Sequence, residues 1–75
     1  MEYVQPVSYK IGDRLFYNYT LFGKNYVEVE IVDIYIDKLY GLEYETIIEV
    51  KETDSDMVYR VTLANDGYRL VQKFN

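Results

Sequence analysis

Carboxylates are the side chains of this sequence whose type and spacing could do chemistry. Glu28 and Glu30 stand two residues apart, a spacing that puts both on one side of a strand. Such a pair could act as general acid and base only in a buried cleft, and we expect these two to face solvent. The chain has no histidine and no cysteine, which excludes serine–histidine or cysteine–histidine nucleophiles and the usual zinc sites. We therefore expect a protein without enzymatic activity, bound metal or cofactor.

Acidic residues are concentrated in the middle of the chain. Residues 28–56 contain ten carboxylates and two lysines, whereas the other residues carry three more cations than carboxylates, for a net charge of −5. Such a region repels phosphate and disfavours general nucleic-acid binding. Either it is a solvated surface that keeps a small protein soluble, or it imitates nucleic acid and occupies a basic groove. The candidate acidic face comprises Glu28, Glu30, Asp33, Asp37 and Glu43.

The elements that must position these side chains are strands, because Tyr, Ile, Val and Thr are abundant and alanine occurs once. The alternation of apolar and charged residues in 26–37 (YVEVEIVDIYID) has one phase up to Ile31 and the other phase from Val32 onward. A strand changes phase in this way when a bulge or sharp bend lies near these two residues. We interpret the change as a strand shared between two neighbours, with its buried set moving to the other face.

The remaining strands follow from alternating runs separated by turn residues. We predict them at residues 14–22, 43–52, 58–63 and 68–72. The loop at 23–25 sets Tyr19 against Val29, and the turn at 53–56 joins the third and fourth strands. The turn at 65–67 closes the last hairpin.

Together these strands predict an all-β fold, a five-stranded antiparallel barrel with a strongly bent second strand and no long helix. Residues 1–10 form an N-terminal arm, since Pro6 disfavours a central strand, and residues 11–75 form a single domain. An exposed edge strand of such a barrel could pair with a second copy of the chain. The lack of cysteine and of a long apolar run leads us to expect a cytoplasmic protein that does not bind membranes.

Two aliphatic residues stand out on the predicted outer face of the third and fourth strands. Ile47 and Val58 are diagonal neighbours there, and the predicted ion pair Glu49–Arg60 lies beside them together with Glu45. A small apolar patch with a charged rim is typical of a protein-binding surface. These residues are therefore the first candidates for a partner site.

Three segments resemble Tudor, KOW and related SH3-like barrels. Residues 11–17 (IGDRLFY) resemble the Gly-Asp opening of these domains, residues 29–34 their bent second strand, and residues 59–67 their Tyr-x-Val and Asp-Gly ending. The resemblance covers about residues 11–72. It implies a small barrel that binds peptides, proteins or nucleic acid, and fold alone does not choose among these.

The resemblance also implies where a ligand would bind. Tudor domains that read methylated side chains use a cage of aromatic residues in loops, whereas Tyr17 and Tyr19 here are in phase with the core. The loop-adjacent aromatics that could line such a cage are Phe22, Tyr26, Tyr40 and Tyr68. A KOW-like nucleic-acid site would use the cations outside the acidic middle, Lys10, Arg14, Lys24, Arg69 and Lys73.

The sequence thus predicts a non-enzymatic protein-binding module that acts as a regulatory or accessory factor. An acidic inhibitor that imitates nucleic acid and a KOW-like nucleic-acid-binding domain stay open as alternatives. The abundance of Tyr, Ile, Asn and Lys is typical of AT-rich coding, which fits a low-GC bacterium or its phage.

Overall fold

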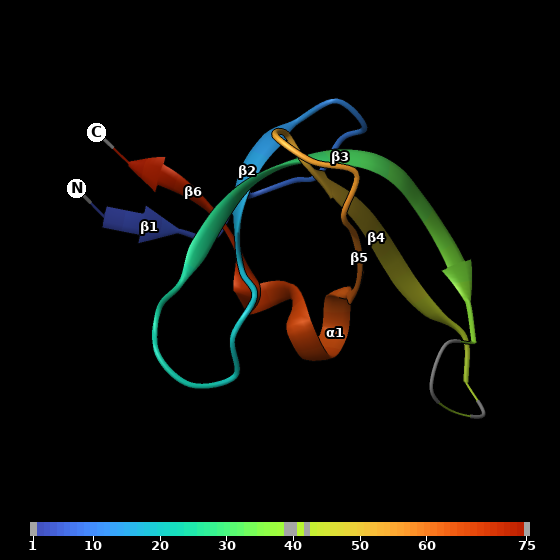
Figure 1. Cartoon of the computed structure of the whole chain (residues 1–75). Coiled ribbons are helices and arrows are strands. Elements are labelled where there is room, and N and C mark those ends of the chain that lie inside the picture. The colour runs from blue at the N-terminus through green and yellow to red at the C-terminus, as the bar shows by residue number, and fades with distance from the viewer. Residues whose placement is uncertain (1, 39–40, 42, 75) are drawn as a thin grey trace.

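Six strands pair into one antiparallel sheet in the computed structural model, which describes residues 2–38, 41 and 43–74 (Figure 1). In chain order the elements are β1 (Glu2–Val4), β2 (Arg14–Asn18), β3 (Tyr26–Asp37), β4 (Glu45–Glu52), β5 (Val58–Thr62), α1 (Leu63–Asp66), η1 (Gly67–Arg69) and β6 (Leu70–Phe74). The strands lie in the order β1-β6-β2-β3-β4-β5, and the sheet curls into a half-barrel with β1 and β5 at its edges. The all-β prediction is confirmed, but the prediction of five strands is wrong.

The sixth strand is β1, which lies in the predicted N-terminal arm. It pairs with β6, with Tyr3 opposite Lys73, so β1 and β6 lie side by side (Figure 1). The Tyr3 ring stacks on Tyr26 with 4.0 Å between centroids and meets Phe16 edge-on at 5.6 Å. A strand of three residues is too short for an alternating pattern, so the sequence alone did not predict it.

The phase change in β3 is a bulge at Val32, as the sequence predicts. Ile31 pairs with Val50 of β4, Asp33 pairs with Glu49, and the register shifts between them. Because Val32 is the extra residue, the bulge keeps both apolar sets on the same side of the sheet. The expectation that the buried set moves to the other face is therefore wrong.

The two hairpins differ in how well the sequence predicts their registers. The β4–β5 hairpin has the predicted register, with Glu49 opposite Arg60. In the β2–β3 hairpin Leu15, and not Tyr19, lies opposite Val29, so the connecting loop is longer than three residues. The register differs by an even number of residues, which leaves the same side chains on the core side.

Residues 63–69 form α1 and η1 where a tight last hairpin was predicted. They carry the chain along the lower end of the half-barrel (Figure 1), and β6 then pairs with β2 and not with β5. Leu63 packs against the core, and a Cβ atom on the buried Gly67 would lie 2.9 Å from the Leu63 Cδ1 atom. A larger residue at the junction of the two helical turns would therefore require the Leu63 side chain to shift.

The core lies on the concave side of the sheet, and we call the opposite side the outer side. The buried cluster consists of Leu15, Tyr17, Val29, Ile31, Ile48, Val50, Val61 and Leu70. Five of the strands contribute to it, so the hydrophobic effect holds the curl of the sheet together. Across the described part of the chain, no helix has the length and apolar character needed to span a membrane.

Candidate functional site

The β2–β3 loop is organised by the side chain of Asn18, the last residue of β2. Its Oδ1 atom accepts hydrogen bonds from the Thr20 backbone N–H at 3.3 Å and from the Thr20 hydroxyl at 3.0 Å. The same oxygen accepts the Asn25 N–H at 3.2 Å, while the Asn18 amide nitrogen donates to the Gly23 carbonyl at 3.1 Å. One amide thus connects the start, the tip and the end of the loop.

Further contacts fix the conformation and the base of the loop. The Asn25 side chain donates to the Thr20 hydroxyl at 3.3 Å, and Gly23 adopts a φ of +88°, which favours glycine. At the base, the Arg69 Nε–H donates to the Asn18 carbonyl oxygen at 2.8 Å, and its guanidinium lies over the Tyr17 ring at 4.9 Å. The loop is therefore an ordered extension of β2 and β3.

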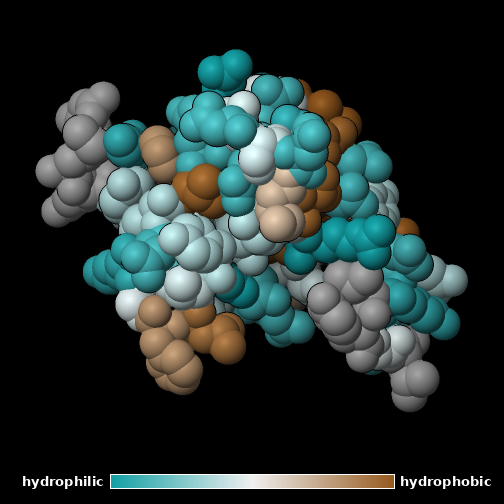
Figure 2. All heavy atoms as spheres, viewed as in Figure 1, coloured by the Kyte–Doolittle hydropathy of each residue, from teal (hydrophilic) through white to brown (hydrophobic). Residues whose placement is uncertain are grey.

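The tip of this ordered loop presents apolar side chains to solvent. Leu21 is 79% exposed and Phe22 is 89% exposed. Figure 2 shows the corresponding patch of hydrophobic atoms at the lower left, where Figure 1 places the β2–β3 loop. Tyr19 precedes the tip and is exposed as well. Exposed apolar residues on a hydrogen-bonded loop are typical of a surface that contacts a partner.

The predicted aromatic loop site is only partly assembled. Phe22 and Tyr68 are both exposed, on the β2–β3 loop and on η1 respectively. Tyr26 is stacked on Tyr3, which uses the ring face that a cage would need. Tyr40 lies outside the described residues. Within the described ranges no ring contact joins Phe22, Tyr26 and Tyr68, so the structure does not assemble a cage from these three.

The prediction of an exposed apolar patch around Ile47 is wrong, because Ile47 is completely buried. It lies between its cross-strand neighbours, Tyr35 of β3 and Thr62 of β5. The Tyr35 hydroxyl donates to Glu49 at 2.5 Å, which holds the ring on the outer side beside Ile47, and this hydrogen bond raises the pKa of Tyr35. Val58, at the sheet edge, is 46% exposed.

The predicted rim of that patch forms structural contacts. The Arg60 Nε atom lies 3.5 Å from the Glu49 carboxylate, as the sequence predicts. The Glu45 carboxylate accepts a long hydrogen bond of 3.4 Å from the Asn65 amide of α1. Glu45 therefore contacts α1, and Glu49 with Arg60 lies near the β5 edge.

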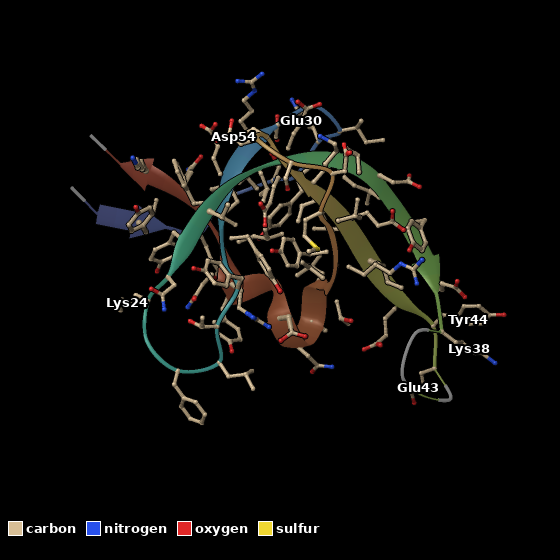
Figure 3. The ribbon with its side chains drawn as sticks, in the orientation of Figure 1. Lys24, Glu30, Lys38, Glu43, Tyr44 and Asp54 are labelled. Carbon is tan, nitrogen blue, oxygen red and sulfur yellow. The ribbon has the colours of Figure 1, made fainter. Side chains whose placement is uncertain are left out.

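The predicted acidic face is interrupted by cations. Glu30 is opposite Arg14 in β2 and opposite Lys51 in β4, with 4.0 Å between the Arg14 Nε atom and the Glu30 carboxylate. In the view of Figure 3, Glu30 is labelled at the top of the molecule and Glu43 at the lower right, so the acidic side chains do not gather at one place. The outer side therefore carries interleaved charges of both signs.

The other acidic positions on β3 make local hydrogen bonds. The Thr53 hydroxyl donates to Glu28 at 3.0 Å, and Asp33 and Asp37 each accept the N–H of the following residue. Carboxylates that are bonded in this way contribute to the local geometry of β3 and of the neighbouring turn.

The five cations of the predicted nucleic-acid site occupy several parts of the molecule. Lys10 and Arg14 line a hollow of about 270 Å³ beneath the N-terminal segment, together with Asp13. Lys73 lies over the Phe16 ring at 4.6 Å, and the Arg69 side chain is only 13% exposed. Lys24 lies in the β2–β3 loop. Arg69 is therefore part of the loop base described above.

A second hydrogen-bonded cluster fixes the β4–β5 turn. The Tyr59 hydroxyl donates to the Glu52 carboxylate at 2.5 Å, and the Ser55 hydroxyl donates to the other oxygen of Glu52 at 2.9 Å. The hydrogen bond to Glu52, with a further contribution from burial, raises the pKa of Tyr59 to about 12. Tyr59 therefore serves as a structural donor to Glu52 and keeps its proton to a higher pH than an ordinary tyrosine.

Sequence reasoning missed Asn18 and Leu21. Leu21 was assigned to a strand because it continues the alternation of the first strand. The signal that could have identified the loop is the run of short polar residues Asn18, Thr20 and Asn25 around a glycine, since such side chains bond to nearby backbone groups.

Comparison of the chain with protein-family models, with curated proteins and with solved structures found no match.

Proposed function

We propose that this protein is a non-enzymatic binding module that docks its β2–β3 loop into an apolar pocket of a partner protein. One observation carries the proposal: Asn18 organises a loop whose largest apolar side chains, Leu21 and Phe22, face solvent. In the free protein both side chains are largely exposed, so they do not contribute to the buried core.

The energetics favour the apolar tip as an anchor. Burying an exposed Leu or Phe side chain is worth roughly 1.5–3 kcal/mol each. Because hydrogen bonds already order the loop, a partner has little backbone entropy to remove on binding. Apolar anchors that enter a pocket from a rigid element commonly dominate the affinity of an interface.

Charge favours a protein as the partner. The net charge of −5 opposes attachment to an anionic lipid surface, although Lys24 lies at the loop. Cations interrupt the acidic side chains of β3, so the structure gives no specific support to an acidic nucleic-acid mimic or to a KOW-like nucleic-acid-binding domain. Protein binding is therefore the function that we put forward. A regulatory or accessory role fits a module of this kind.

We also retain the SH3-like barrel as a proposal for the fold family. The bent β3, which is shared between β2 and β4, supports it, as does the pairing of the last strand with β2.

The experiment compares capture of proteins from the source organism by three forms of the immobilised chain. These are the wild type, the double variant Leu21→Ser/Phe22→Ser, and the control Ile36→Ser, which changes a residue that is 68% exposed on β3. We expect a protein that binds the wild type and the control but binds the double variant at least 30-fold more weakly, as measured by calorimetry with the purified partner. Equal capture by all three forms would refute the docking role of the loop. A double variant that still captures the protein but no longer binds lipid vesicles would also refute it.

A further inference from the structure

The outer edge of β5 carries backbone groups that point away from the sheet. The Glu52 N–H donates to the Met57 carbonyl at 2.9 Å, which makes these two residues a hydrogen-bonded pair. Because antiparallel pairs alternate, Tyr59 and Val61 also bond toward β4, whereas Val58 and Arg60 direct their N–H and C=O groups outward. An edge of this kind can accept another strand.

Side chains at this edge form a hollow beside the strand. It measures about 450 Å³ and is lined by Tyr17, Glu49, Val58, Tyr59 and Arg60. Met57, which precedes β5, is 55% exposed, and Val58 is 46% exposed. The edge thus combines outward-directed backbone groups, exposed apolar side chains and an open hollow beside the strand.

Residues 56–60 (DMVYR) complement their own sequence when they are read in the opposite direction. We propose that a second copy of this chain pairs antiparallel with β5 about a two-fold axis through Val58. Val58 then lies opposite the partner's Val58, Met57 opposite the partner's Tyr59, and Asp56 opposite the partner's Arg60. The proposal concerns a different surface from the β2–β3 loop and does not depend on the function proposed above.

In this register the side chains on both sides of the joined sheet meet suitable partners. On the core side, the Met57 sulfur meets the partner's Tyr59 ring, a favourable sulfur–aromatic contact. On the outer side, Arg60 lies between Glu49 of its own chain and the partner's Asp56, so a cation bridges two carboxylates. Each of the five positions therefore gains a complementary neighbour.

Neighbouring two-fold registers are worse. The registers with the axis at Tyr59 or at Met57 also keep the outward backbone groups opposite each other, but they lose the pairing of Asp56 with the partner's Arg60. A further shift moves the axis to Arg60 or to Asp56. The first places Arg60 against the partner's Arg60, and the second places Asp56 against the partner's Asp56. Like charges directly opposite each other destabilise a strand pair, and only the register centred on Val58 pairs Asp56 with the partner's Arg60.

Cysteine cross-linking tests the geometry, and it is unambiguous because the chain has no cysteine of its own. Hydrogen-bonded antiparallel neighbours have Cα atoms about 5.5 Å apart, which a disulfide can span. We expect Val58→Cys to form a disulfide-linked dimer under mild oxidation at micromolar concentration. The matched control Val32→Cys, an exposed β3 position away from the edge, should stay monomeric.

A charge swap tests the register by sedimentation equilibrium of the full chain between about 5 and 500 µM. We expect Arg60→Asp to weaken dimerisation at least tenfold and the double variant Arg60→Asp/Asp56→Arg to restore it, while circular dichroism monitors folding. A wild type that stays monomeric throughout, a dimer unaffected by Arg60→Asp, or equal cross-linking of the two cysteine variants would overturn the proposal. If Arg60→Asp fails to fold, the cross-linking comparison decides alone.

Discussion

Replacing Asn18 by alanine should loosen the β2–β3 loop without touching its apolar tip. The change removes the oxygen that binds Thr20 and Asn25 and the amide that binds Gly23. The hydrogen bond from Arg69 to the Asn18 backbone carbonyl is unaffected, so the base of the loop stays attached. The variant therefore isolates the contribution of one side chain to the order of the loop.

The magnitude follows from four hydrogen bonds of the Asn18 side chain, two of them half-buried and two exposed. Water replaces lost partners at exposed groups, so we assign about 0.5 kcal/mol to each bond, the low end of the usual range. The free energy of unfolding should then fall by about 2 kcal/mol, which lowers the Tm of a domain of this size by about 8–16 °C.

Urea unfolding followed by circular dichroism measures the free energy, and amide hydrogen exchange at Thr20 and Asn25 reports on the loop itself. The matched control is Asn65→Ala, which removes one long hydrogen bond to Glu45 and should cost less than about 0.5 kcal/mol. The reasoning fails if Asn18→Ala costs no more than the control, or if the two amides exchange as slowly as in the wild type. Under the proposed function, the variant should also bind the partner more weakly.

Two further predictions concern stability. Ile47→Ala should cost about 2–4 kcal/mol in urea unfolding because Ile47 is fully buried, whereas Val58→Ala at the exposed edge should cost under about 1 kcal/mol, and equal costs would contradict the burial of Ile47. The pKa of Tyr59 is about 12 in the folded protein, against 10.0 in the unfolded chain. The hydrogen bond from Tyr59 to Glu52 therefore contributes fully to stability below pH 10, and this contribution is lost as the pH rises toward 12. Tyr59→Phe should therefore make the fall in unfolding free energy above pH 10 shallower, and an unchanged slope would argue against the bond to Glu52.

The sequence predicted best where a local pattern and a short turn act together. The bulge at Val32 is visible in the alternation of β3, and the β4–β5 register follows from the turn at 53–56 and the pairing of Glu49 with Arg60. These features depend on residues that are close in the chain, so the alternation of side chains is enough to locate them.

The candidate site was less accessible to sequence reasoning. An alternating pattern determines which face a residue occupies, but a register shift of two or four residues leaves that face unchanged. The β2–β3 register and the exposure of Leu21 were therefore decided by the hydrogen bonds of Asn18 and by the left-handed backbone of Gly23. Ile47 shows the converse, because neighbours from β3 and β5 bury a position that the pattern assigned to solvent.

By itself, the sequence determined that this protein is a sheet of strands with a bulged β3 and an apolar side that must be covered. Only the tertiary structure decided that β1 joins the sheet, that β6 pairs with β2, and that β5 is left as an edge. The physical reason is range: side-chain alternation and turn chemistry act over a few residues, whereas strand order depends on which distant segments bury the most apolar surface together.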